Sequence, residues 1–142
     1  MSKLYMGFDA GTQSVKVAVY DEQFNCLTSH SLPTHLHYPQ PGWVEMSADE
    51  FLEITVKSMA ACAQSLREMG RDPKDVCAVM GDGIICGIVG VNPDGDAVTP
   101  YINYLDSRTT PDVEALNARE LEIWGRETGN PVASPMFPAM FA

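Results

Sequence analysis

The beginning of the chain alternates hydrophobic and polar residues in the manner of β-strands. Residues 4–9 are mostly apolar, and residues 15–20 place a valine at every second position, which is the period of a half-buried strand. A polar turn at 21–25 separates them from a third such stretch at 26–32. The pattern predicts three strands joined by short turns as an antiparallel meander.

A helical pattern follows. Ser47 and, three residues later, Glu50 are typical of a capping box at a helix start. Apolar residues then recur at spacings of three and four, as on one face of an amphipathic helix. They are Leu52, Val56, Met59, Ala63 and Leu66. Gly70 predicts the end of this helix, because glycine readily adopts the left-handed conformation found after a helix C-terminus.

The second half of the chain predicts further strands and a second helix. The apolar runs 76–80 and 84–91 are expected to be strands, the first of them short and buried. Residues 92–95 carry a turn signal, Asn-Pro-Asp-Gly, between strands. The Thr-Pro pair at 110–111 suits a helix start, so a helix is expected over about 112–124.

Composition and charge narrow the function classes. A chain of 142 residues with 45% hydrophobic and 20% charged residues is typical of one globular domain. Its net charge of −10 argues against nucleic acid and anionic membranes as partners, because both need clustered basic residues. No apolar run approaches the roughly 18 residues of a membrane helix, and the first residues lack signal-peptide features. We expect a cytoplasmic protein.

The cysteines give no sign of a metal site. They are Cys26, Cys62, Cys77 and Cys86. No two of them form a Cys-x-x-Cys pair or a zinc-binding spacing. We therefore expect free and largely buried thiols.

The turn between the first two strands carries the strongest candidate chemistry. It combines a carboxylate, a glycine, three hydrogen-bonding side chains and a cation, which are Asp9, Gly11, Thr12, Gln13, Ser14 and Lys16. Gly11 can adopt a positive φ and expose its amide, so the turn suits phosphate oxygens. Asp9 is expected to hold Mg²⁺ through water, and Lys16 adds positive charge. The alternative is an ordinary hairpin turn whose polar groups satisfy backbone amides.

A second glycine-rich segment is a poorer candidate. Gly81, Gly83 and Gly87 mimic a dinucleotide-binding fingerprint, but the third glycine comes one position late. A strand rather than a helix is expected to follow, and Asp82 would oppose a pyrophosphate. We do not predict a dinucleotide site here.

The 9–16 motif resembles the first phosphate motif of the FGGY family of sugar and polyol kinases, within the actin, hexokinase and heat-shock-chaperone superfamily. Four further segments resemble that family in the same order, at 41–45, 94–95, 105–108 and 128–131. The resemblance implies an α/β fold with a ribonuclease-H-like (actin/hexokinase-like) mixed sheet and helices on its faces. It also implies that residues 1–142 are the N-terminal part of the kinase N-terminal domain.

The resemblance implies transfer of the γ-phosphoryl group of ATP, with Mg²⁺, to a hydroxyl of a sugar or polyol. Where xylulose kinases have Gly-Gln-Met-His-Gly, this chain has an apolar segment with Ile85 and Cys86 at the expected substrate side. Asp82 and Asp106 are the remaining candidate acceptors for substrate hydroxyls. The alternatives are a turn cap for Asp82 and an ion pair with Arg108 for Asp106. A buried apolar wall at 85–86 favours a pentulose or a short polyol over a hexose.

The resemblance also implies parts that residues 1–142 do not contain. Family members are much longer, with a general-base aspartate that we expect beyond Ala142 and a second, adenosine-binding domain. We expect a fragment that is inactive alone, and a homodimer is left open. The competing hypotheses are a non-catalytic ligand- or partner-binding module of the same fold and a nucleotide-driven switch protein.

Overall fold

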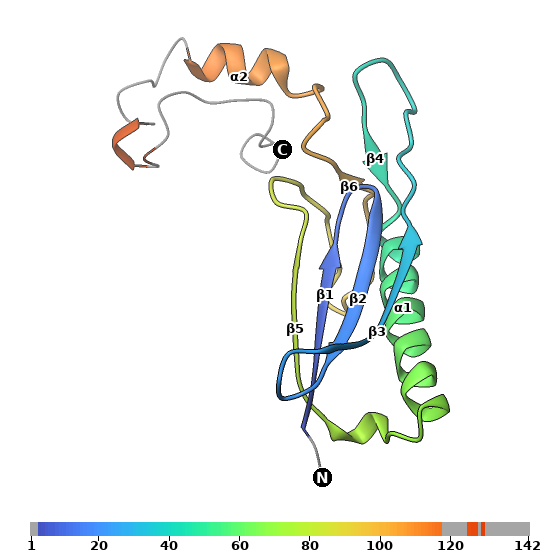
Figure 1. The fold of residues 1–142 in the computed structure, drawn as a ribbon. Coiled ribbons are helices and arrows are strands. Elements are labelled where there is room, and N and C mark those ends of the chain that lie inside the picture. The colour runs from blue at the N-terminus through green and yellow to red at the C-terminus, as the bar shows by residue number, and fades with distance from the viewer. Residues whose placement is uncertain (1–2, 118–124, 128, 130–142) are drawn as a thin grey trace. The chain divides into compact units, whose positions relative to one another are not determined.

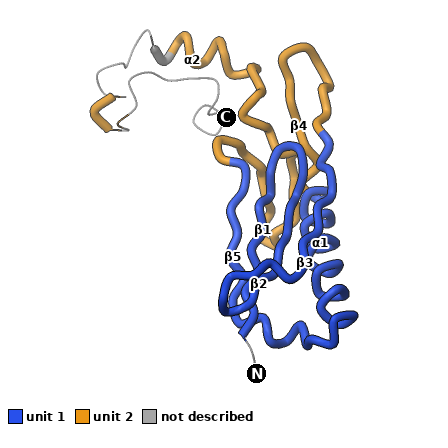
Figure 2. Tube along the Cα trace, viewed as in Figure 1, with its two compact units in different colours: residues 1–35, 49–84 blue, residues 36–48, 85–142 orange. Residues whose placement is uncertain are grey.

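The computed structural model describes residues 3–117, 125–127 and 129. Its elements, in chain order, are β1 (Leu4–Ala10), β2 (Ser14–Tyr20), β3 (Cys26–Pro33), β4 (Glu45–Met46), α1 (Ala48–Glu68), the 3₁₀ helix η1 (Pro73–Asp75), β5 (Val76–Gly83), β6 (Tyr101–Ile102) and α2 (Thr110–Asn117) (Figure 1). The chain divides into two compact units. Unit 1 comprises residues 1–35 and 49–84, and unit 2 comprises residues 36–48 and 85–142 (Figure 2).

Unit 1 is built on a mixed four-stranded sheet in the order β3-β2-β1-β5. The predicted meander is confirmed, because β1 pairs with β2, and β2 with β3, in antiparallel fashion. β5 pairs with β1 in parallel. A parallel partner needs a crossover connection, and the chain between β3 and β5 includes α1.

The core of unit 1 lies between α1 and one face of the sheet (Figure 1). Alternate residues of β1 and β2 point into it, as the period of two predicts. The buried members are Leu4, Met6, Ala10, Val15, Val17 and Val19 from the sheet and Ile54, Cys62 and Leu66 from the helix. The remaining side chains of β1 and β2 therefore project from the other face of the sheet.

The predicted buried face of α1 is partly wrong. Leu52 and Val56 are 65% and 56% exposed. The buried residues are instead Ile54, Ser58, Cys62 and Leu66, at a strict spacing of four. Small side chains lie at the middle of this buried line, where the Cys62 thiol donates to the Val17 carbonyl at 3.6 Å. The spacing of large apolar residues did not predict this buried face of α1, because its two central positions are a serine and a cysteine.

The predicted end of α1 is confirmed. Gly70 has a φ of +73°. Its amide donates to the Arg67 carbonyl at 2.9 Å, and the Arg71 amide donates to the Leu66 carbonyl at 2.9 Å. These two bonds form a Schellman motif, in which the residue after the helix has a left-handed conformation. Glycine suits position 70 because it adopts this conformation at low cost.

The strand predicted at 76–80 is present, but it is longer and less buried than expected. β5 continues to Gly83 as an edge strand, with Val79 56% and Met80 80% exposed. An apolar run predicts a strand without predicting how many neighbours cover it. Because Gly81 and Gly83 belong to this strand, they do not form a strand-to-helix phosphate turn, in agreement with the rejection of a dinucleotide site.

The strand predicted at 84–91 is wrong. This part of unit 2 forms only isolated bridges, Ile88 to Ile102 and Val91 to Ala97, and the paired strands are β4 and β6. The apolar composition that suggested a strand also fits an irregular segment, in which glycines at 87 and 90 weaken strand pairing. The 92–95 turn is confirmed by a Gly95 φ of +90° and a bond of 3.0 Å from its amide to the Asn92 carbonyl.

The second helix begins at Thr110 and is described as far as Asn117; the rest of its predicted length lies outside the described residues. All four cysteines are free, as expected, but only Cys62 is buried. The expectation of largely buried thiols is therefore wrong. No helix among the described residues is long and apolar enough to cross a membrane.

Candidate active site

The turn between β1 and β2 in unit 1 is closed by a bond of 3.0 Å from the Gly11 amide to the Ser14 carbonyl. Gly11 does not have the positive φ that the sequence suggested. Position 11 is crowded for a different reason, because a Cβ there would lie 3.1 Å from the Ser14 carbonyl oxygen. Glycine at position 11 therefore allows the two ends of the turn to approach closely and puts no side chain over the backbone, as a phosphate-binding loop requires.

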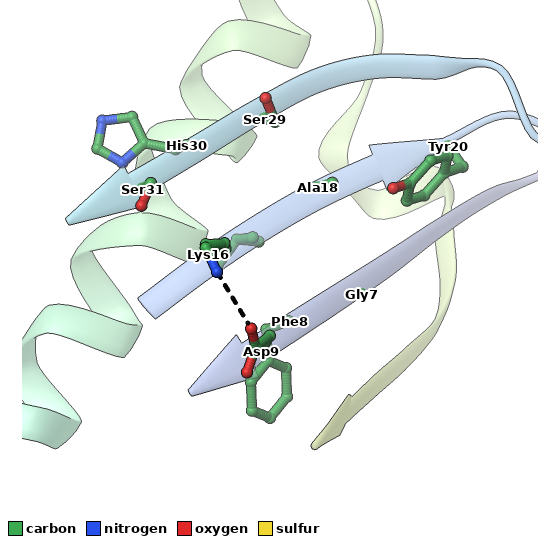
Figure 3. Close-up of a pocket in the computed structure, with 10 residues that line it drawn as sticks. Gly7, Phe8, Asp9, Lys16, Ala18, Tyr20, Ser29, His30 and Ser31 are labelled. Atoms are coloured by element: carbon green, nitrogen blue, oxygen red, sulfur yellow. Dashed lines mark hydrogen bonds and ion pairs between the residues drawn. The ribbon is translucent and has the colours of Figure 1, made fainter. Parts of the chain in front are cut away.

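Asp9 and Lys16 face each other beside this turn. They are register partners on β1 and β2, and the Lys16 Nζ lies 3.5 Å from the Asp9 Oδ2 (Figure 3). Their side chains are 50% and 64% exposed. A pair this exposed contributes little to stability, so both groups are available to a ligand at low energetic cost.

Asp82 extends this arrangement onto the neighbouring strand. It is exposed and is the register partner of Asp9 in the parallel pairing of β1 with β5. Residues at one register position point to the same face of a sheet. Lys16, Asp9 and Asp82 thus form a row across three strands, on the face opposite the α1 core.

Two hollows lie on this open face of unit 1. The larger, of about 440 Å³, includes Gly7 and Ala18 between the polar side chains of Asp9, Lys16, Ser29 and Ser31 (Figure 3). The second, of about 320 Å³, is lined by Gly7, Phe8, Met80, Gly81 and Asp82. Because small residues leave the sheet backbone accessible, a ligand can approach the row of charged groups from this face.

A residue that the sequence reasoning missed holds the 11–14 turn from behind. Thr34 follows β3, and its Oγ1 donates to the Thr12 carbonyl at 2.7 Å. Its amide donates to the Gln13 carbonyl at 3.1 Å. No local pattern signals this role, because Thr34 and Thr12 are 22 residues apart in the chain.

Unit 2 contains a buried charge cluster around Asp106, whose side chain has no exposed area. Its Oδ1 accepts from the Arg108 amide at 2.8 Å and from the Arg108 Nε at 2.9 Å. Its Oδ2 accepts from the Arg108 Nη2 at 2.7 Å and from the Val44 amide at 2.6 Å. Burial alone would raise the pKa of Asp106, but these hydrogen bonds outweigh it and lower the pKa below its usual value.

This cluster joins two of the segments that suggested the kinase resemblance, 41–45 and 105–108. The Arg108 Nη2 also donates to the Glu45 Oε1 at 2.7 Å, and the Arg108 Cζ lies 3.8 Å from the centre of the Trp43 ring. The Ser107 amide donates to the Gly42 carbonyl at 2.8 Å. The two segments therefore form one structural unit, and the ion-pair alternative for Asp106 is the arrangement found.

Ile85 and Cys86, in the apolar segment that follows β5, also belong to unit 2. Ile85 is 78% exposed, so the expectation of a buried apolar wall is wrong for this residue. Cys86 has a φ of +64° and is partly buried. The Tyr101 ring lies against Gly87, where a Cβ would be 2.0 Å from the Tyr101 hydroxyl oxygen. Burial is the main cause of the raised pKa of Tyr101.

Comparison with known proteins identifies the chain. The model of the FGGY family of carbohydrate kinases, N-terminal domain, matches residues 4–141. The chain belongs to this family. The assignment rests on almost the whole sequence, and it agrees with the mixed sheet of unit 1.

Individual relatives of this FGGY chain include kinases of different substrates. A glycerol kinase from Geobacter sp. (strain M21) is 30% identical over 94% of this chain and 27% of its own length. A xylulose kinase from Staphylococcus xylosus is 24% identical over 77% of this chain and 22% of its own length. The chain thus spans about a quarter of these curated relatives.

The fold agrees with solved FGGY structures. The crystal structure of a xyloylose kinase from Brucella ovis matches 94% of this chain and 27% of its own chain, with a TM-score of 0.83 and 22% sequence identity. Structural neighbours of this kind carry the actin/hexokinase-like fold. The expected fold class is therefore confirmed.

The sequence-predicted site residues of this FGGY chain fall into the two units. Unit 1 holds the predicted cofactor and metal residues together with one predicted substrate residue, which are Asp9, Gly11, Thr12, Gln13, Ser14, Lys16 and Asp82. Unit 2 holds Ile85, Cys86 and Asp106. Within unit 1, the register brings Asp82 next to Asp9, which the sequence alone did not predict.

Proposed function

We propose that the protein containing this chain transfers the γ-phosphoryl group of ATP to a hydroxyl of a sugar or polyol. The observation that carries the proposal is the row of Lys16, Asp9 and Asp82 beside a glycine turn, in a chain of the carbohydrate kinase family. The row offers one cation and two carboxylates on an accessible face. Phosphoryl transfer requires positioning and charge neutralisation more than covalent chemistry by the protein.

We assign the phosphates to the 11–14 turn and to Lys16, and Mg²⁺ to Asp9 through water. The fit rests on the short approach at Gly11, where a Cβ would lie 3.1 Å from the Ser14 carbonyl, and on the half-exposed Asp9 carboxylate. Oxygen ligands are the ones that Mg²⁺ prefers. Bound Mg²⁺ would neutralise charge on the phosphate oxygens. We assign neither the general base nor the adenosine site to residues 1–142.

We assign a substrate-binding role to Asp82 in preference to Asp106. The Asp82 carboxylate is exposed beside Asp9 and can accept hydrogen bonds from substrate hydroxyls. The Asp106 carboxylate already accepts four hydrogen bonds and has no exposed area. A glycerol kinase and a xylulose kinase among the relatives support a ketopentose or a short polyol as substrate in preference to a hexose.

A substrate panel tests this proposal. The intact protein, meaning the complete product of the reading frame that encodes residues 1–142, is assayed for ADP release with glycerol, tetritols, ketopentoses and hexoses. We expect turnover with glycerol or a ketopentose and weak turnover with hexoses. Asp82→Asn should raise the KM of the preferred substrate about tenfold or more, because a charged hydrogen-bond acceptor is lost. Asp94→Asn, at an exposed turn, should leave this KM unchanged.

The same panel separates the second candidate function. The apolar character of Ile85 and Cys86 also suits a non-catalytic module of the same fold that binds a ligand or partner. An intact protein that binds Mg·ATP or a polyol without releasing ADP would favour that module. Preference for hexoses, or an unchanged KM in Asp82→Asn, would overturn the substrate assignment alone.

A further inference from the structure

The 11–14 turn is held by hydrogen bonds from a single residue of a neighbouring segment. The Thr34 hydroxyl lies 2.7 Å from the Thr12 carbonyl oxygen and 3.5 Å from the Gly11 carbonyl oxygen. The Thr34 amide donates to the Gln13 carbonyl at 3.1 Å. Three successive carbonyls of the turn thus lie within reach of Thr34.

These bonds fix the direction of the turn amides as well as its carbonyls. The described chain has no cis peptide bond, and in a trans peptide the N–H points opposite to the C=O of the preceding residue. Because the Thr12 and Gln13 carbonyls point to Thr34, the amides of Gln13 and Ser14 point away from it. Successive amides that point the same way form a site for anions.

We propose that Thr34 is a positioning residue for the nucleotide phosphates. This inference rests on the proposed function, since it assigns the phosphates to the 11–14 turn. Thr34 acts through the turn: its hydroxyl holds the Thr12 carbonyl back, and the amides that follow are held toward the phosphate oxygens. A hydroxyl at this position is required, while the γ-methyl group of threonine is not.

Substitutions in the intact protein test the role of the hydroxyl. Thr34→Val keeps the shape and removes the donor, whereas Thr34→Ser keeps the donor. Loss of one hydrogen bond predicts a rise of about threefold to tenfold in the KM for Mg·ATP of Thr34→Val. Thr34→Ser should stay within about twofold of the wild type. Thr28→Val makes the same chemical change on β3, away from the turn, and should leave the KM for Mg·ATP unchanged.

Further readouts separate positioning from support of the fold. The KM for the sugar or polyol should not change in Thr34→Val, and melting temperatures are compared for every variant. If Thr34→Val does not fold, Thr34→Ala takes its place with the same expected rise. A KM for Mg·ATP that is equal in the wild type, the variant without the hydroxyl and Thr34→Ser would overturn the inference, whatever the melting temperatures.

The proposed function can fail separately. If the wild type shows no turnover, the same variants are compared by calorimetric titration with Mg·ATP, and the expected change is the same factor in Kd. Weaker binding by Thr34→Val, restored by Thr34→Ser, supports the positioning role without the kinase reaction. A wild type that binds no Mg·ATP would overturn both proposals.

Discussion

The guanidinium of Arg108 lies 3.8 Å above the ring of Trp43. The same guanidinium donates to Asp106 and Glu45, and the side chains of Arg108, Glu45 and Asp106 are 19%, 17% and 0% exposed. A planar guanidinium can stack on an aromatic ring while its edges bind carboxylates. The Arg108 side chain therefore contacts both the 41–45 and the 105–108 segments, and its loss should affect both.

Removal of that side chain should destabilise unit 2. Arg108→Met keeps most of the length but leaves two buried carboxylates without their partner, which costs about 3 kcal/mol of unfolding free energy. Urea unfolding of the intact protein measures the change, and the emission of Trp43 should change because its cation partner is lost. Arg126→Met is the matched control, because its ion pair with Glu127 is 72% and 62% exposed and should contribute less than about 1 kcal/mol. Equal stability of the two variants would contradict the interpretation.

Asp106 should make the protein sensitive to acid. Its folded pKa is lower than the ordinary value of 3.8, so the folded state binds fewer protons at this group than the unfolded state. The stabilisation is complete above the ordinary pKa and is lost as the pH falls through the lowered one. We expect the melting temperature of the wild type to fall below about pH 4, and that of Asp106→Asn to start lower and fall less steeply. Parallel curves for the two proteins would show that Asp106 does not titrate in this way.

Gly81 is required because it makes room for an aromatic ring. A Cβ at position 81 would lie 2.1 Å from the Cζ of Phe8, whereas a Cβ at Gly7 would meet nothing within 4 Å. Neither glycine has a positive φ, so steric contact alone distinguishes them. Gly81→Ala should destabilise the intact protein by about 2 kcal/mol, and Gly7→Ala should change its stability by less than about 0.5 kcal/mol.

A second substitution checks that the cost of Gly81→Ala comes from this contact. Replacement of Phe8 by leucine in the Gly81→Ala background should restore part of the lost stability, because the smaller side chain relieves the clash. Denaturant unfolding of the single and double variants gives the coupling. Additive effects in the double variant would rule out Phe8 as the cause.

The free cysteines should differ in their reaction with thiol reagents. Burial is the largest cause of the raised pKa of the Cys62 thiol, and its side chain has no access to solvent, whereas Cys26 is exposed. Only the thiolate reacts, so Cys26 should be labelled well before Cys62, which should be labelled last. Mass spectrometry of peptides after timed alkylation measures the order. Early labelling of Cys62 would show that the α1 core opens readily.

Local sequence patterns predicted which segments of unit 1 form strands and helices better than they predicted how exposed those elements are. The alternation of valines predicted β2, and Gly70 predicted the end of α1, because each signal depends on neighbouring residues alone. The exposed position of Met80 could not be predicted in the same way. An apolar run has the same composition in a central strand and in an edge strand, and the difference depends on which strands pair with it.

In the candidate site, too, the sequence predicted features formed by neighbouring residues and missed contacts between distant ones. The 9–16 motif contains the 11–14 turn and Lys16 in one continuous stretch, so the sequence predicted them together. The adjacency of Asp82 to Asp9 depends on the parallel register of two strands more than 60 residues apart, which no local pattern contains. Thr34 was missed for a related reason, since its hydrogen bond to Thr12 spans 22 residues.

The central claim is that Asp9 belongs to a working phosphoryl-transfer site, and kcat of Asp9→Asn in the intact protein tests it most directly. The substitution keeps the shape and removes the charge that we propose for holding Mg²⁺, so kcat with the preferred polyol or ketopentose should fall by about a hundredfold or more. The melting temperature should stay close to that of the wild type, because the Asp9 to Lys16 pair is half-exposed. Asp94→Asn, the control, should keep the kcat of the wild type. An Asp9→Asn protein with the kcat of the wild type would show that the 9–16 motif is an ordinary hairpin turn and would contradict the account.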